Sequence, residues 1–206
     1  MKIAAYVMSC PDREEIRLQT LLNLAATDWG EEPYVEIDDT SCVRRQERQE
    51  ITARKTLEKA CADAPDFILF LEDDLQFNRY LRHNLTHWAP LCETDPRSHF
   101  FASLYNPTVL ALETHHDGAF FRAHPESVYG SQAFLLSLPT ARYIVERWDE
   151  VPGMQDIKMS RLASRRCPIF YHAPSMVQHL GERSAWGGHY HMARDFAADW
   201  KAKERS

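Results

Sequence analysis

Three consecutive carboxylates follow an apolar run in the first half of the chain. Residues 67–77 read FILFLEDDLQF, so an apolar segment leads directly into Glu72, Asp73 and Asp74. Carboxylates this close repel one another and resist burial unless a cation lies among them. Hard oxygen ligands of this kind suit Mg²⁺ or Mn²⁺, and such an ion can hold a substrate diphosphate and neutralise a phosphate leaving group. A structural alternative stays open, because an acidic residue after a strand can also cap the next helix.

The segments before this acidic cluster predict alternating strands and helices. Short apolar or alternating runs indicate strands, and apolar residues at helical spacing indicate helices. We expect strands over residues 2–8, 33–39 and 66–74, and helices from Glu14 and over residues 42–64. This order implies a parallel sheet with right-handed crossovers. Ligands bind at the carboxyl ends of the strands in such sheets, so the acidic cluster is expected at the ligand-binding edge.

The second half of the chain is less regular. We expect helices over residues 78–91, from Pro139, over 156–166 and from Met192 to the end, and strands over 99–105, 131–137 and 168–174. Residues 106–130 and 175–191 show little periodicity, so both are predicted to be loops, the first of them a long active-site or acceptor loop. No shift in composition marks a domain boundary. We therefore expect a single α/β domain over residues 1–206, with a mostly parallel central sheet flanked by helices.

Composition narrows the class of protein. The chain has 206 residues, 44% of them apolar, which suits one globular domain with a hydrophobic core. A net charge of −6 argues against a nucleic-acid coat or a membrane-surface protein. The five cysteines are scattered and form no CxxC pair, which is typical of reduced thiols in a cytosolic protein. No apolar run approaches the roughly 18 residues that a membrane span needs, so we expect a cytoplasmic protein.

Two segments of the chain resemble glycosyltransferases of the GT-A fold. ARKTLEKACADAPDFILFLEDDL, at residues 53–75, resembles the helix and strand that lead into the acidic DxD-type motif of that fold. Its LEDD form is similar to type IV N-acetylglucosaminyltransferases and to the procollagen and lipooligosaccharide galactosyltransferases. YHAPSMVQHLGERSAWGG, at residues 171–188, resembles an element near the end of the type IV catalytic domain. The chain has a lysine, Lys55, where many relatives have asparagine after the AR pair.

The resemblance implies a Rossmann-like GT-A domain that uses a nucleoside-diphosphate sugar, most commonly a UDP-sugar, together with Mn²⁺ or Mg²⁺. Residues 1–77 would form the nucleotide-sugar-binding half, and residues 78–206 would form the acceptor and catalytic half. The size of the chain suits a bacterial or phage enzyme.

The resemblance also implies a set of metal ligands. Asp74, the last acid of the motif, would bind the metal ion directly. Glu72 and Asp73 would orient the ribose or a metal-bound water, and Glu72 is a further candidate ligand. His179 would supply another contact, and an imidazole nitrogen suits Mn²⁺ better than Mg²⁺. The alternative for His179 is a loop histidine that is hydrogen-bonded to backbone.

Residues after the first two strands are expected to bind the donor. Ser9 and Arg13 follow the first strand, and Asp38 and Asp39 follow the second, where the nucleotide should lie. Arg54, on the helix before the acidic strand, is a candidate contact for the diphosphate. The alternatives are solvated strand ends and an exposed helix face.

Two residues of the second half are candidates at the sugar. An inverting transfer needs a base that takes the proton of the acceptor hydroxyl, and the resemblance places Asp156 in that role. The alternative for Asp156 is the N-cap of its helix. Gln132 would shape the sugar or acceptor pocket. In a retaining enzyme, Gln132 or Asp156 would face the anomeric carbon instead.

Several functions stay open at this point. The acceptor could be a glycan, a small molecule or a hydroxymethylated base in DNA, which local basic and aromatic residues would suit. The same acidic cluster could serve a metal-dependent nuclease or phosphotransferase. A non-catalytic module that binds sugars or nucleotides is the third possibility, and it would bind a donor without turnover.

Overall fold

A computed structural model of the chain describes residues 1–41, 44–107, 119–124, 128, 130–181 and 191–204. The strands are β1 (Ile3–Ser9), β2 (Tyr34–Ile37), β3 (Phe67–Leu71), β4 (Leu75–Phe77), β5 (Phe101–Ser103), β6 (Ala119–Ala123), β7 (Ala133–Ser137), β8 (Ile169–Ala173) and β9 (Val177–His179). The helices are α1 (Glu14–Ala25), α2 (Arg45–Asp63), α3 (Leu81–His87), α4 (Ala89–Cys92), α5 (Leu138–Glu146) and α6 (Gln155–Ser164), with 3-10 turns at Pro11–Arg13 and Trp148–Glu150.

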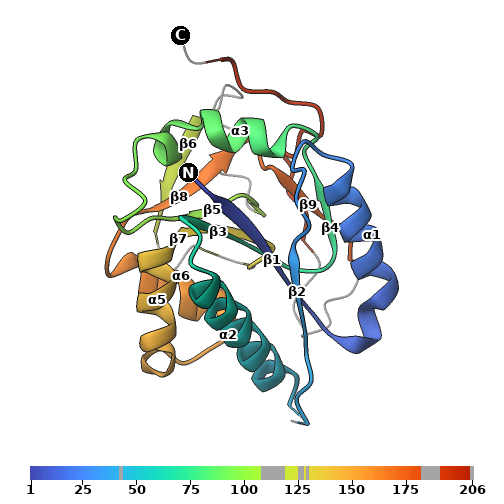
Figure 1. The fold of residues 1–206 in the computed structure, drawn as a ribbon, viewed down its shortest axis with the longest axis vertical. Coiled ribbons are helices and arrows are strands. Elements are labelled where there is room, and N and C mark those ends of the chain that lie inside the picture. Colours follow the sequence, from blue (N-terminus) through green and yellow to red (C-terminus); the bar gives the residue numbers. More distant parts are fainter. Residues whose placement is uncertain (42–43, 108–118, 125–127, 129, 182–190, 205–206) are drawn as a thin grey trace.

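One seven-stranded sheet forms the centre of the molecule, in the order β2-β1-β3-β7-β5-β8-β6 (Figure 1). β1 pairs in parallel with both β2 and β3, and β5 pairs in parallel with β8. β7 is antiparallel to β3 and β5, and β6 is antiparallel to β8. All the strands of this sheet except β6 and β7 therefore run in the same direction, which confirms the predicted α/β fold with a mostly parallel central sheet.

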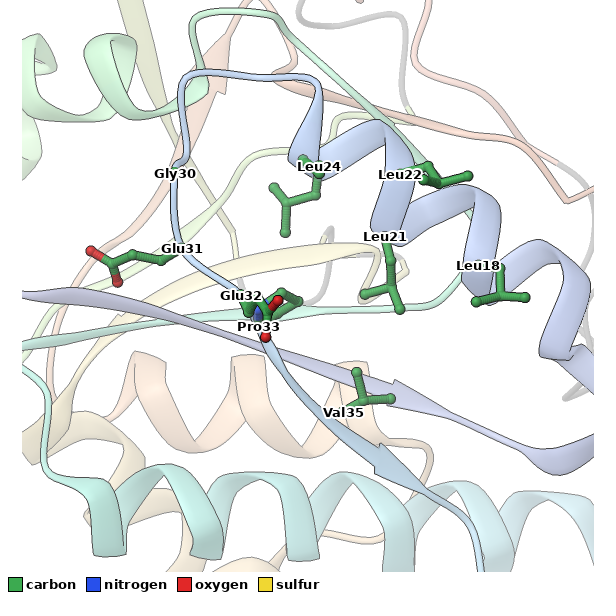
Figure 2. A pocket seen from close by; sticks show the side chains of 10 residues that line it. Leu18, Leu21, Leu22, Leu24, Gly30, Glu31, Glu32, Pro33 and Val35 are labelled. Carbon is green, nitrogen blue, oxygen red and sulfur yellow. The ribbon is translucent and has the colours of Figure 1, made fainter.

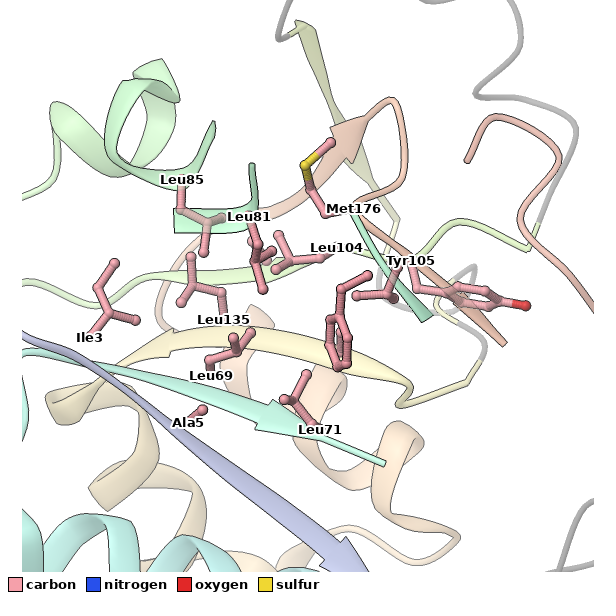
Figure 3. Packing of buried hydrophobic residues seen from close by; sticks show 14 of the residues in the cluster. Ile3, Ala5, Leu69, Leu71, Leu81, Leu85, Leu104, Tyr105, Leu135 and Met176 are labelled. Atoms are coloured by element: carbon pink, nitrogen blue, oxygen red, sulfur yellow. The ribbon is translucent and has the colours of Figure 1, made fainter. Parts of the chain in front are cut away.

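Helices cover both faces of this sheet (Figure 1). Leu69 and Leu71 of β3 belong to one buried cluster together with Leu81 and Leu85 of α3 (Figure 3), and Leu24 of α1 joins it. Ile68 and Phe70, the alternate residues of β3, belong to a second cluster that includes side chains of α2, α5 and α6. Because both faces of β3 are covered, the strand is apolar at every position, as buried parallel strands are.

A second, two-stranded sheet pairs β4 with β9 in antiparallel fashion, and Leu75 lies opposite His179. Residues 175–191 were predicted to be a loop, so β9 is a correction. Each strand of this pair has only three residues, too few for a periodic signal. The pairing brings two distant segments together next to the end of β3.

The predicted helix from Met192 to the end of the chain is wrong for the described residues, since residues 192–204 contain none. The side-chain amide of Asn78 donates to the carbonyl oxygens of Ala197 (2.6 Å) and Trp200 (2.9 Å). The amide of Asn84 also donates to Trp200, at 3.0 Å. These carbonyl oxygens accept hydrogen bonds from side chains of another segment. Residues 192–204 therefore pack against the domain without regular secondary structure.

The predicted loop over residues 106–130 contains a strand, β6, at its described part. Residues 108–118, 125–127 and 129 lie outside the described residues, as do residues 182–188 of the second glycosyltransferase-like segment. None of the described helices is both long and apolar enough to cross a membrane.

An open apolar groove of about 700 Å³ lies between α1 and β2 (Figure 2). Leu18, Leu21 and Val35 line it, together with Glu31 and Glu32. None of the candidate site residues lines this groove. The acidic cluster lies elsewhere, directly after the carboxyl end of β3.

Candidate active site

The turn that carries the three acids is fixed on two sides. Thr20 of α1 is fully buried; its hydroxyl donates to the carbonyl oxygen of Asp73 (2.7 Å) and accepts from the backbone N–H of Leu75 (2.8 Å). On the other side, the N–H of Leu180 donates to the carbonyl oxygen of Asp74 at 2.8 Å. The backbone of the turn is thus held at the carboxyl end of β3, the position predicted from the sequence.

Asp73 joins the acidic turn to the loop after β1. Its Oδ2 accepts a hydrogen bond from Ser9 Oγ at 2.5 Å, and its Oδ1 accepts one from Arg13 Nε at 2.8 Å. Burial, helped by the nearby charge of Asp74, outweighs Arg13 and Ser9, so the pKa of Asp73 is raised. Three of the predicted donor-binding residues therefore lie together.

Asp74 and His179, from segments 105 residues apart, form a buried pair. His179 Nε2 lies 3.0 Å from Asp74 Oδ2, and the two side chains are 5% and 3% exposed. Arg13 Nη2 donates to the same oxygen, whereas Asp74 Oδ1 is buried and has no hydrogen-bond partner among the described residues. Burial works against the charged form of both groups. At Asp74, the hydrogen bond and charge of His179, together with Arg13, outweigh burial, so the pKa of Asp74 is lowered. At His179, the hydrogen bond and charge of the partner, together with Glu72 and the His191 carbonyl, outweigh burial, so the pKa of His179 is raised.

The backbone carbonyl of His191 orients the ring of His179, because His179 Nδ1 lies 3.2 Å from that oxygen. A hydrogen bond at one ring nitrogen directs the other nitrogen toward a ligand, as in many metal-binding histidines. Nε2 of His179 is thereby turned toward Asp74.

The Asp74–His179 pair fits one edge of a metal site. An octahedral ion with bonds of about 2.1 Å separates neighbouring ligands by about 3.0 Å, which is the distance between Asp74 Oδ2 and His179 Nε2. A Cβ atom at Gly181 would lie 2.5 Å from Asp74 Oδ2 and 3.2 Å from His179 Nε2, so glycine keeps the space beside both atoms open. The described residues hold no group of three or more His, Cys, Asp or Glu that could bind a metal. Water and phosphate oxygens would have to complete the shell, as they commonly do for Mg²⁺.

Glu72 turns toward β7 and α6 instead of completing this pair. Its Oε1 accepts hydrogen bonds from Ser131 Oγ at 2.5 Å and from Gln155 Nε2 at 3.1 Å. Gln132 Nε2 lies 3.5 Å from Oε2, a weak contact. Burial, with the nearby charge of Asp74, raises the pKa of Glu72 to about 7. The role of Glu72 as a metal ligand stays a prediction.

Asp156 lies at the second position of α6, and the N-cap position belongs to Met154. The N-cap alternative for Asp156 is therefore wrong. Its Oδ2 accepts from the backbone N–H of Gly130 at 3.0 Å, and its Oδ1 accepts from the N–H of Ile157 in its own helix at 2.9 Å. The carboxylate is thus held at the start of the helix, next to the segment that leads into β7.

Gly130 brings the sugar-side candidates together. It has a φ of +75°, and a Cβ atom there would lie 2.2 Å from Gln132 Oε1 and 3.2 Å from His191 Cε1. Only glycine fits this position without a shift of its neighbours. Gln132, Asp156 and His191 therefore surround one short stretch of backbone.

Sequence reasoning missed Gln155 and Tyr105. Gln155 donates to Glu72 and, at 2.5 Å, to Ser131 Oγ, and Tyr105 OH lies 2.7 Å from His191 Nδ1. Glutamine in a helix and tyrosine after a strand are common, so neither gave a signal. His191 itself stacks on His179, with ring centroids 5.3 Å apart.

The remaining donor-side candidates divide into two groups. Asp38 is buried. It lies beside the loop after β1, because its backbone N–H donates to the carbonyl oxygen of Ser9 at 2.9 Å. Its carboxylate accepts from Arg48 Nε at 2.5 Å and from the N–H of Thr40 at 2.9 Å. Burial raises the pKa of Asp38, but these hydrogen bonds outweigh it and the pKa is lowered.

Arg54 lies on α2 and is half-buried, whereas Asp39 lies in the segment after β2 and is exposed. Asp39 pairs with Lys55, and Arg54 pairs with Glu58 (3.0 Å) and Asp149 (3.2 Å). These contacts do not join them to the acidic turn, and their role in donor binding stays a prediction.

Comparison with known proteins gives the fold a context. No protein-family model matches the chain, and no curated protein matches it. Among solved structures, a glycosyltransferase involved in the glycosylation of the major capsid of PBCV-1 matches with a TM-score of 0.53 at 12% identity, over 88% of this chain and 95% of that chain. Mannose-1-phosphate geranyltransferase from Thermus thermophilus matches with a TM-score of 0.42 at 10% identity, over 84% and 74% of the two chains, which is too low to carry an argument. At this identity the likeness concerns the fold alone: the chain has an α/β fold, with a mostly parallel central sheet flanked by helices, similar to that of a glycosyltransferase.

Proposed function

We propose that this chain is a metal-dependent GT-A glycosyltransferase that moves a sugar from a nucleoside-diphosphate sugar, foremost a UDP-sugar, to an acceptor hydroxyl with inversion. One observation carries the proposal. Asp74 and His179 meet as a buried pair at the carboxyl edge of the sheet, with Asp74 Oδ2 and His179 Nε2 3.0 Å apart. This spacing suits two neighbouring ligands of one octahedral divalent cation, and Gly181 leaves space beside both atoms. The shared fold with a glycosyltransferase supports the same function.

Asp74 Oδ2 and His179 Nε2 would hold the Mn²⁺ or Mg²⁺ ion, which when bound would neutralise the charge that develops on the departing diphosphate. His179 would keep its orientation through the carbonyl of His191. Ser9 and Arg13, which lie against the acidic turn, would face the diphosphate from the β1 side. Asp38, next to Ser9, is the candidate contact for the nucleotide.

The sugar would lie near Glu72, Gln132 and Gly130. Gln132 is buried, and within the part of the chain that the structure describes its Oε1 has no hydrogen-bond partner. An acceptor atom of this kind suits a ligand rich in hydroxyl donors, because a buried acceptor without a donor costs about 1–3 kcal/mol. Gln155 and Ser131 would act by holding the Glu72 carboxylate in place.

Asp156 would act as the base. Its carboxylate lies in the first turn of α6, where the helix dipole favours a negative charge. The bond from the Gly130 N–H fixes one carboxylate oxygen next to the sugar-side residues. Asp156 would take the proton of the acceptor hydroxyl as that oxygen attacks the anomeric carbon.

A donor panel tests the proposal. Thermal unfolding is measured with a set of nucleoside-diphosphate sugars, each with Mn²⁺ and with EDTA. A donor at about 100 times its dissociation constant stabilises a protein by about 2.7 kcal/mol, which for a chain of this size raises the melting temperature by about 5–10 °C. We expect that shift for one donor class and only with metal. The absence of a metal-dependent shift for every donor would overturn the proposal.

The acceptor and the rival functions need separate experiments. A glycan or small-molecule acceptor suits the net charge of −6 better than DNA does. A hexose-sized mass gain on hydroxymethylated DNA would show instead that the acceptor is a modified base. Donor binding without turnover on any acceptor would indicate a binding module, and metal-dependent cleavage of nucleic acid would indicate a nuclease. The cytoplasmic, bacterial or phage setting expected from the sequence belongs to this proposal.

A further inference from the structure

Arg13 spans two of the three acids. Its Nε donates to Asp73 Oδ1 at 2.8 Å, and its Nη2 donates to Asp74 Oδ2. That second oxygen is also the one that lies 3.0 Å from His179 Nε2. A guanidinium group therefore contacts the carboxylate oxygen that faces the candidate metal position.

We propose that Arg13 is an internal counter-cation of the metal site, and that it moves from Asp74 to the diphosphate of the donor so that metal ion and nucleotide bind cooperatively. The proposal rests on the function proposed above. It assigns Arg13 a positioning role in the assembly of the site.

The contacts of Arg13 allow such a movement about one fixed end. Asp73 is held independently, because its Oδ2 accepts from Ser9 Oγ at 2.5 Å. The guanidinium is a rigid plane and would move as a unit: the bond from Arg13 Nε to Asp73 keeps one end in place while the Nη2 end tilts away from Asp74. The Arg13 side chain is 13% exposed, so part of it reaches the surface of the site.

A diphosphate is a suitable second partner for Arg13. The planar fork of a guanidinium matches the oxygens of a phosphate group. Arg13 ends the 3-10 turn directly after β1, at the carboxyl edge of a parallel pair of strands, where ligands of α/β sheets bind. The donor would thus meet Arg13 on the side of the acidic turn where its phosphates are expected.

Two cations that share one oxygen would compete when no anion lies between them. A divalent ion at Asp74 and His179 would lie beside the positive charge of Arg13, and like charges at short distance repel strongly in a partly buried site. A diphosphate would give both cations a common anion. Metal ion alone should therefore bind weakly, and nucleotide should tighten it; by linkage, the metal ion should tighten the nucleotide by the same factor.

Calorimetric titration of Mn²⁺ with and without saturating UDP measures this coupling. In the wild-type protein we expect UDP to tighten Mn²⁺ binding by about tenfold or more, within the usual range of coupling between sites. In Arg13→Gln, Mn²⁺ alone should bind about tenfold tighter than in the wild type, and the effect of UDP on Mn²⁺ affinity should nearly vanish.

Arg17→Gln is the matched control. Arg17 lies in the same region, and its Nη1 donates to Ser9 Oγ (3.0 Å) and to the carbonyl oxygen of Cys10 (3.2 Å). It shows no contact with Asp74, so its removal should leave the coupling near the wild-type value. Arg13→Lys is a second variant that keeps the positive charge without the fork, and it should retain part of the coupling.

The outcomes separate this inference from the proposed function. If Arg13→Gln keeps both the wild-type Mn²⁺ affinity and the wild-type coupling, the role of Arg13 is overturned. If Arg13→Lys abolishes the coupling as completely as Arg13→Gln does, the role of the positive charge of Arg13 is overturned. If the wild-type protein binds no Mn²⁺ with or without UDP, the proposed function itself fails.

Discussion

Replacement of Thr20 with valine tests how the acidic turn is held. The hydroxyl of Thr20 serves two backbone groups of the turn, the carbonyl oxygen of Asp73 and the N–H of Leu75. Valine has the same shape, so the change removes these bonds without opening a cavity. Each buried backbone group left without a partner costs about 1–3 kcal/mol, and the added methyl returns about 1 kcal/mol. We therefore expect the free energy of unfolding to fall by about 1–5 kcal/mol.

Thr56→Val is the matched control, because Thr56 is also fully buried and also in a helix. Its hydroxyl donates to the carbonyl oxygen of Thr52, which the helix already pairs with a backbone N–H. The control should therefore lose no more than about 1 kcal/mol. Urea unfolding measures both variants, and with an m-value of about 2–3 kcal/mol/M the midpoint of Thr20→Val should fall by about 1 M. Equal midpoints for the two variants would refute the view that Thr20 fixes the turn.

The remaining predictions concern the site and the acid stability of the fold. Asp156→Asn should lower sugar transfer by about 10²-fold or more while metal-dependent donor binding and the melting temperature stay unchanged; a large fall in melting temperature with residual transfer would point to a structural role. Gly181→Ala should push the Asp74 carboxylate out of place and weaken Mn²⁺ binding by about 10–100-fold in a calorimetric titration, and unchanged affinity would exclude the proposed metal position. His172 is fully buried, and burial lowers its pKa to about 4. Its ring is thus neutral in the folded protein and becomes charged on unfolding below about pH 6.5. Stability should therefore fall as pH drops from about 6.5 to about 4, by about 3 kcal/mol in total. Urea midpoints across this range should fall less in His172→Asn than in the wild type, and equal slopes would assign the acid sensitivity to other groups.

The sequence predicted the strand that carries the acids because local pattern decides it. β3 is apolar at every position, since helices cover both faces of the sheet. Pro65 follows the helix α2 and marks its end, and Ala64 ends that helix in a left-handed conformation. Strand order and the ligand-binding edge then follow from the handedness of the crossovers.

The partner of Asp74 could not be found from local pattern. β4 and β9 have three residues each, and their pairing joins segments about a hundred residues apart. Only the resemblance of the QHLG segment pointed to His179. The contacts of Gln155 with Glu72 were not predictable either, because they depend on how α6 packs against the start of β7.

The error at the C-terminus has a related cause. Phe196 and Trp200 are four residues apart, a spacing that suits a helix, and both pack against the buried cluster. Asn78 and Asn84 bind backbone carbonyls of the same segment. Tertiary hydrogen bonds from another part of the chain thus replace those of a helix, which propensity alone does not reveal.

We propose that Asp74 and His179 hold a divalent ion that binds a nucleotide diphosphate. Anomalous diffraction from crystals grown with MnCl₂ and UDP locates such an ion. We expect one manganese peak about 2.1–2.3 Å from both Asp74 Oδ2 and His179 Nε2, with diphosphate oxygens completing the shell. A UDP molecule bound without manganese at this pair, or a manganese peak at other side chains, would contradict it.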